Sequence, residues 1–345
     1  MKDKRMVWLC LVVAMALIIP SAVVFAAAQK EETAQPEVEV PVEKVVLKIG
    51  HIFPVMHVTH RSLEAMAAYV DQKTKGGLIL EIFPGGQLGK GANLSENVML
   101  GTVDMATAGP GLLSRIEPSF AIWGAEFMFK GEETLFRVVK DPVGKEIYER
   151  LRNNHGIRVI GTGYLGARHL TTSKTLVKTP AELKGLKIRI PNIPYRREAF
   201  IAMGASPTPM AFQELYLALQ QGVVDGQENP LQQITSMKFY EVQKYLILTG
   251  HAQNPEMLII NEDKYANLPG SHQKVLLEGG EVYGDTCRRL FKEEEAELLE
   301  QIKEAGMSVI EPDLDAFRQA VKDVPAKFEN AWGAGLYERV QEAQK

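Results

Sequence analysis

Cysteine is nearly absent from this chain of 345 residues, which contains only two. Cys10 falls in an apolar N-terminal segment, so an exported and cleaved chain would keep Cys287 alone and could form no internal disulfide. The helical neighbourhood of Cys287 predicts a packing residue. HExxH, GxSxG, CxxC and P-loop motifs are also missing. The sequence therefore predicts no enzyme, no cofactor and no metal centre.

An excess of positive charge is missing as well. Lysine and arginine total 39 against 43 acidic residues, for a formal net charge of −4, and no basic stripe occurs. This balance argues against nucleic acid as a partner. With 46% apolar and 24% charged residues, the composition is that of a globular protein large enough for two domains.

One long apolar run occurs, and it lies at the N-terminus. Met6–Pro20 is uncharged, follows three basic residues and precedes the small residues Ala26–Ala28. This order indicates a signal peptide over residues 1–28, followed by an acidic, proline-containing disordered linker over 29–44. The alternative is an uncleaved anchor, because the uncharged stretch is long enough to span a bilayer. Either interpretation places the protein in the periplasm or elsewhere outside the cytoplasm.

From Val45 onward the pattern alternates between strands and helices, which predicts an α/β fold with a mostly parallel sheet. The first five expected elements are Val45–Gly50, His60–Lys75, Leu78–Phe83, Asn93–Gly101 and Val103–Ala108. Further on we expect a helix over Glu132–Asn154, short strands over Ile157–Gly161 and Met257–Asn261, and a long helix over Ser271–Ala305.

A glycine motif resembles a dinucleotide-binding fingerprint, with glycines at 161, 163 and 166. The residues that follow, Arg168–Ser173, favour a strand, so no helix N-terminus is available for a pyrophosphate. We expect no nucleotide site. The glycines instead suit a strand that crosses between domains and approaches a ligand closely.

Three histidines lie close together in the sequence, at positions 51, 57 and 60. Their spacing matches no standard ligand pattern and no acidic partner is nearby, so a metal site is not expected.

Arg189 stands in a short strand, Leu186–Ile190, in which the apolar residues share the opposite face. Pro191 ends this strand just beyond the arginine. An arginine at the end of a buried strand suits a bidentate grip on a carboxylate. The alternative is a structural ion pair.

Four motifs in register surround this strand. They are Lys184–Pro191, the PTPM segment that leads into Phe212, the VDGQENP turn over Val224–Pro230, and Lys238–Leu246. In this order they resemble the solute-binding proteins of TRAP (tripartite ATP-independent periplasmic) transporters. Phe120–Phe129 departs from the proline-containing pattern usual in that family.

The resemblance implies a two-lobed periplasmic-binding-protein (Venus-flytrap) fold of the α/β class, with crossing hinge strands and a long spanning helix. Lobe I would comprise residues 45–165 plus about 255–290, and lobe II residues 166–254 plus about 291–345. The ligand would lie between the lobes, with the loop His51–His57 and the segment Ala108–Gly111 on the lobe I side.

The resemblance also implies ligand contacts. Arg189 would be the carboxylate clamp, with Arg168, Asn229 and Phe212 around it. For Arg168 the alternative is an interdomain ion pair, and for Phe212 it is ordinary core packing.

The implied function is an extracytoplasmic solute-binding subunit that captures a small organic acid and delivers it to TRAP membrane permease subunits. The alternative is a carboxylate-sensing module that presents its ligand to a membrane receptor.

Overall fold

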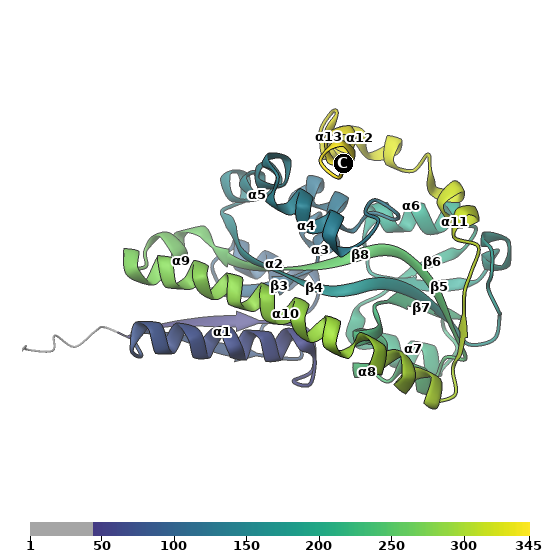
Figure 1. Cartoon of the computed structure of the whole chain (residues 1–345), viewed down its shortest axis with the longest axis horizontal. Coiled ribbons are helices and arrows are strands. Elements are labelled where there is room, and N and C mark those ends of the chain that lie inside the picture. The colour runs from purple at the N-terminus through teal and green to yellow at the C-terminus, as the bar shows by residue number, and fades with distance from the viewer. Residues whose placement is uncertain (1–43) are drawn as a thin grey trace, which may run out of the picture. The chain divides into compact units, whose positions relative to one another are not determined.

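Two long strands, β4 (Ile157–Thr172) and β8 (Tyr245–Asn261), run side by side through the middle of the sheet (Figure 1). The computed structural model describes residues 44–345. The predicted signal peptide, and all but the last residue of the predicted linker, lie outside the described residues. Within residues 44–345, no helix combines the length and apolar character needed to cross a membrane.

The nine strands of residues 44–345 belong to one sheet, in the order β2-β1-β3-β8-β4-β7-β5-β6, with β9 paired to β8. The remaining strands are β1 (Val45–Gly50), β2 (Leu78–Phe83), β3 (Met105–Ala108), β5 (Lys187–Ile190), β6 (Ser206–Pro209), β7 (Gly226–Asn229) and β9 (Ser308–Ile310).

The helices cover both faces of this sheet. The α-helices are α1 (Val58–Thr74), α2 (Ala92–Met99), α3 (Pro110–Leu113), α4 (Glu132–Lys140), α5 (Pro142–His155), α6 (Pro194–Ala202), α7 (Leu215–Gln220), α8 (Leu231–Ser236), α9 (Glu262–Ala266), α10 (Gly270–Glu304), α11 (Leu314–Val321), α12 (Glu329–Trp332) and α13 (Leu336–Glu342). The 3₁₀ helices are η1 (Pro118–Gly124), η2 (Pro180–Leu183), η3 (Phe212–Glu214), η4 (Phe239–Glu241) and η5 (Pro325–Phe328).

The sheet has two parallel halves joined by an antiparallel centre. In the first half β1 pairs parallel with β2 and β3, and in the second half β5 pairs parallel with β6 and β7. Strands β4 and β8 pair antiparallel with each other, and each also pairs antiparallel with one half. The predicted parallel arrangement therefore holds within each half. The two short strands predicted in the centre are in fact 16 and 17 residues long.

One predicted helix is two helices. The expected helix over Glu132–Asn154 is divided between α4 and α5 at Asp141, where the backbone is extended. The Asp141 carboxylate accepts a hydrogen bond from the amide of Val143 and so caps α5, whose first residue is Pro142. The Asp-Pro pair is a helix start signal that the prediction missed.

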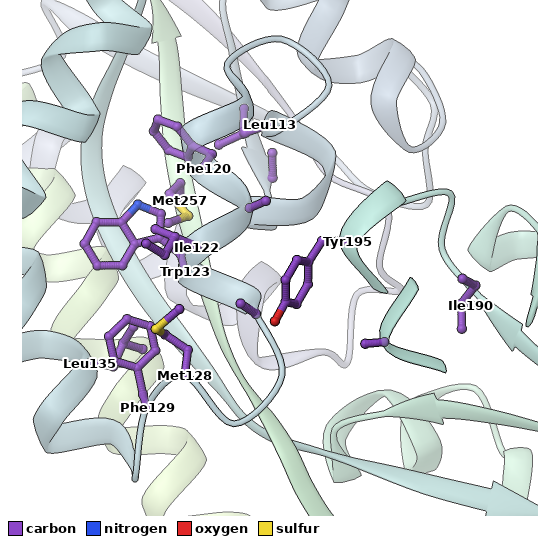
Figure 2. Packing of buried hydrophobic residues seen from close by; sticks show 14 of the residues in the cluster. Leu113, Phe120, Ile122, Trp123, Met128, Phe129, Leu135, Ile190, Tyr195 and Met257 are labelled. Carbon is purple, nitrogen blue, oxygen red and sulfur yellow. The ribbon is translucent and has the colours of Figure 1, made fainter. Parts of the chain in front are cut away.

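Alternation along β8 shows that the core lies on both sheet faces. Met257 and Ile259 belong to the large cluster under η1 and α4–α6, whereas Leu258 and Ile260 pack with α1 and α10. Figure 2 shows part of the larger cluster, where Phe120 and Trp123 of η1 lie near Met257. A third cluster lies around α7 and α8 in the second half.

Helix α10 runs along both halves and packs directly on the backbone of β4 (Figure 1). A Cβ atom on Gly280 would lie 1.9 Å from the carbonyl oxygen of Ile160, and one on Gly161 would lie 2.5 Å from the carbonyl oxygen of Gly280. A Cβ on Gly163 would meet the Cys287 sulfur at 2.8 Å. The glycines of the fingerprint-like motif therefore allow α10 to pack against the backbone of β4. The prediction that they allow a ligand to approach closely is wrong, because the space beside them is filled by this helix.

Adding one methyl group at this contact tests how much the fold depends on it. We expect Gly280→Ala to lower the free energy of unfolding by about 3 kcal/mol, because the new Cβ overlaps backbone atoms that cannot rotate away. Gly270→Ala, on the same helix with nothing within 4 Å of the added Cβ, is the control and should change it by less than about 0.5 kcal/mol. Urea unfolding of both variants measures the difference, and equal effects would contradict the packing argument.

Candidate functional site

A cavity of about 570 Å³ is lined by residues from both halves of the sheet. All four residues predicted to contact a ligand line it, namely Arg189, Arg168, Asn229 and Phe212. The opposite wall includes Ile52 and Phe53 of the loop after β1 and residues 107–111 at the end of β3. The structure therefore brings together the segments expected on both sides, although their role in ligand binding stays a prediction.

Arg189 is 2% exposed, and its guanidinium is anchored by the backbone. Its Nε and Nη2 atoms donate hydrogen bonds of 3.0 and 2.6 Å to the carbonyl oxygen of Met210. Within residues 44–345, no carboxylate lies within ion-pair distance of Arg189, and its Nη1 atom forms no hydrogen bond. Burial lowers the pKa of Arg189 to about 9, so the group remains a cation at pH 7.

Arg168 forms an ion pair with a carboxylate of the protein itself, that of Glu228. Its Nε and Nη2 atoms both donate to the Glu228 carboxylate, and Nη2 also donates to the Glu228 carbonyl oxygen at 2.8 Å. Its Nη1 atom donates to the Asn254 side chain at 3.1 Å. Arg168 thus forms an ion pair, as the alternative interpretation expected, but its partner Glu228 lies in the same expected lobe and the pair is not interdomain. Arg168 also lines the cavity.

Glu228 is the centre of a buried network. Besides Arg168 it accepts a hydrogen bond of 2.9 Å from Arg196 of α6, and His251 lies 3.2 Å away. Burial by itself raises the pKa of Glu228, but the two arginines outweigh burial and hold it well below its usual value. Glu228 is therefore an anion matched by two cations.

Arg196 extends this network to the segment after η1. It donates to the carbonyl oxygen of Gly124 at 2.8 Å, and its Nε lies 3.0 Å from the carboxylate of Glu126. Burial raises the pKa of Glu126 to about 7, although Arg196 opposes the shift. Glu126 lies in Phe120–Phe129, the segment that departs from the family pattern. This departure marked the segment as unusual, but it did not predict the contact between Glu126 and Arg196.

Asn229 and Phe212 have structural partners of their own. The side-chain oxygen of Asn229 accepts a hydrogen bond of 2.9 Å from Arg168, and its amide nitrogen donates to Gln227. Phe212 meets Phe53 edge-on across the cavity, with 5.8 Å between ring centroids, and it also packs against Phe239. The core interpretation of Phe212 is therefore compatible with its place in the wall.

The three histidines contact each other or the backbone in the structure. His51 and His60 lie 2.9 Å apart through their ring nitrogens, and the Nδ1 atom of His57 accepts the amide of Thr59 to cap α1. Among residues 44–345, no group of three or more His, Cys, Asp or Glu side chains is placed to hold a metal ion.

Sequence reasoning missed several polar residues of the site. Asn254 and Glu256 line the cavity from β8, and Arg196 lines it from α6. The strand predicted here began only at Met257, whereas β8 begins at Tyr245, so strand alternation was not applied to Asn254 or Glu256.

Comparison with known proteins gives a consistent result. Residues 49–331 match the family described as bacterial extracellular solute-binding protein, family 7. The 2,3-diketo-L-gulonate-binding periplasmic protein YiaO of Escherichia coli is 36% identical over 286 residues, covering 80% of this chain and 85% of that protein. The sialic acid-binding periplasmic protein SiaP of Vibrio cholerae is 32% identical over 294 residues, covering 85% and 91%.

Solved structures show the same similarity. A TRAP periplasmic solute-binding protein of Roseobacter denitrificans with bound L-galactonate has a TM-score of 0.82 and 32% identity, covering 88% of this chain and 99% of that one. One from Polaromonas with D-erythronate also has a TM-score of 0.82 and 32% identity, covering 87% and 98%. These are two-lobed binding proteins, so the predicted fold class is confirmed.

The buried network predicts a large loss of stability when its central anion is neutralised. Glu228→Gln should lower the free energy of unfolding by about 3–5 kcal/mol, because Arg168 and Arg196 would remain buried without their carboxylate. The control is Glu293→Gln, which breaks an exposed ion pair with Arg289 on α10 and should have little effect. Urea unfolding at pH 7 measures both, and a small loss for Glu228→Gln would contradict the charge assignment.

Proposed function

We propose that this chain, which belongs to bacterial extracellular solute-binding protein family 7 and is a solute-binding protein of the TRAP type, captures a small sugar acid by its carboxylate and delivers it to a membrane permease. Arg189 is the clamp in this proposal, and Arg168, Asn229 and Phe212 complete the wall around it.

Family membership bears out three of the predictions. Members of this family are solute-binding proteins and not enzymes, as the missing catalytic motifs predicted. They act in the periplasm, as the predicted export implied. Their ligands are small organic acids, and they work with TRAP membrane subunits.

The proposal rests on a difference between three buried arginines, of which two have a carboxylate partner and one does not. Arg168 and Arg196 share the Glu228 carboxylate, whereas Arg189 has only a neutral carbonyl as partner among the described residues. A buried cation without a counter-ion is unfavourable, and an anion in the cavity would relieve this penalty. A carboxylate near the free Nη1 atom would therefore gain both charge pairing and a hydrogen bond.

The solutes named for similar proteins support a sugar acid. Diketogulonate, sialic acid, galactonate and erythronate are each named with a similar protein, and each carries one carboxylate on a hydroxylated carbon chain. The cavity of this protein offers both kinds of partner, since amide side chains such as Asn192, Asn254 and Gln233 accompany the arginines.

Closure of two lobes around the solute completes the proposal. With lobe I as residues 45–165 plus about 255–290 and lobe II as the rest of the folded chain, the contact between Phe53 and Phe212 joins the lobes. A second contact lies nearby, where a Cβ on Gly111 would overlap the Ile193 side chain at 2.0 Å. These contacts are those expected of a closed form, and rotation about the middle of β4 and β8 would open it.

Removing the clamp tests this proposal directly. We expect Arg189→Ala to weaken binding of a sugar acid such as galactonate by about 2–5 kcal/mol, or roughly 30-fold or more, because the carboxylate loses a buried charged partner. Arg115→Ala is the control, since Arg115 is an exposed arginine at the rim of the same cavity. Isothermal titration calorimetry against a panel of aldonates and uronates measures the affinities.

The stability of the unliganded variants separates a lost contact from a damaged fold. Arg189→Ala should melt at or above the wild-type temperature, because it removes an unpaired buried charge. If sugar acids bind Arg189→Ala as tightly as the wild type, the clamp is wrong and Arg168 becomes the first alternative.

A further inference from the structure

Glu256 is a buried carboxyl group in the wall of the cavity. It is 4% exposed and stands on β8 opposite Gly163 of β4, one residue before the stretch of β8 that pairs with β3. Among the described residues it forms no ion pair, unlike Glu228 with its two arginines. The buried acid Glu228 behind the wall is therefore matched by cations, whereas Glu256 in the wall is not.

Two neighbours of Glu256 line the cavity with it. One is Gly109, where an added Cβ would lie 3.7 Å from the Glu256 Oε2 atom, so no side chain covers the carboxyl group at that point. The hydroxyl of Thr107 is close enough to affect its charge, and both Gly109 and Thr107 line the cavity too. Arg168 also influences Glu256 but is bonded to Glu228.

The charge of Glu256 responds to pH near neutrality. Burial raises its pKa to about 7, opposed by the Thr107 hydroxyl and by Arg168. From α10 it faces Tyr283 and Cys287, whose pKa values burial raises, so both remain uncharged. Glu256 is thus the group on this part of the wall whose charge changes between pH 6 and pH 8.5.

A buried carboxyl group in the cavity wall discriminates between a solute that ends in a hydroxyl group and one that ends in a second carboxylate. A hydroxyl group can donate to the ionised form or accept from the protonated form, so it is accommodated in both states. A second carboxylate would meet a like charge in a poorly solvated site, where repulsion is much stronger than in water.

We propose that Glu256 is a specificity-determining residue that hydrogen-bonds a hydroxyl at the far end of the solute and excludes a second carboxylate there. The protein then selects aldonates, which are polyhydroxy monocarboxylates, over the aldarates of the same carbon skeleton. This inference rests on the proposed function, because it takes the first carboxylate to be held by Arg189.

Matched acid pairs test the inference. The probes are galactonate with galactarate and erythronate with meso-tartrate, which differ within each pair only by oxidation of the terminal carbon. We expect the wild type at pH 8 to bind one of the two aldonates more tightly than the other. In calorimetric titrations it should bind that aldonate at least tenfold more tightly than the matching aldarate. Glu256→Gln should reduce this ratio by at least tenfold, mainly because the aldarate binds more tightly.

Two controls isolate the charge at this position. Glu214→Gln makes the same chemical change at an exposed glutamate on the rim of the cavity and should leave the ratio unchanged. Glu256→Asp keeps the charge and should keep most of the discrimination, and it replaces Glu256→Gln as the test variant if the latter fails to fold. The wild-type ratio should also fall between pH 8.5 and pH 6, because Glu256 takes up a proton, whereas the ratio of Glu256→Gln should stay nearly constant.

The outcomes separate the two proposals. An unchanged ratio in Glu256→Gln, with galactonate or erythronate still bound and still lost in Arg189→Ala, overturns the role of Glu256 and leaves the clamp intact. Failure of the wild type to bind any of the four acids overturns both the sugar-acid function and this inference.

Discussion

The pairing of Glu228 with Arg168 and Arg196 is the interaction on which the rest of the site depends. It joins β7, β4 and α6 at one buried point, and through Arg196 it reaches the segment after η1. Because one carboxylate serves both of these arginines, Arg189 is left with a carbonyl partner and a positive charge that faces the cavity. In the proposed function, this shared ion pair therefore determines which of the three arginines receives the ligand anion.

A second constraint is steric and acts on the opposite side of β4. Helix α10 approaches so closely that backbone meets backbone at Gly161 and Gly280, with no side chain between them. The long strands, which carry Arg168 and Glu256, are thus backed by a helix that spans both halves of the sheet.

The sequence was informative where a local pattern determines the structure. Alternation around Arg189 and the proline after it indicated a buried strand that carries one arginine, and the motifs around it predicted Arg168, Asn229 and Phe212 as its neighbours, all of which line the same cavity. It was less informative where distant segments meet. The glycines at 161, 163 and 166 weaken a strand locally, so β4 was predicted to be short, and only the contact with α10 explains them. Glu256 was missed because the predicted strand began only at Met257, whereas β8 begins at Tyr245.

The pairing of β3 with β8 has a consequence for how the protein is made. Met105 lies opposite Ile260, so the first half of the sheet cannot join the rest until more than two thirds of the chain has been synthesised. Until then β3 has one neighbour in the sheet, β1, and one unpaired edge. Contacts of such large sequence separation slow folding, since a long loop must close before they can form. The binding cavity, which residues of β3 and β8 both line, therefore cannot form until β8 has been synthesised.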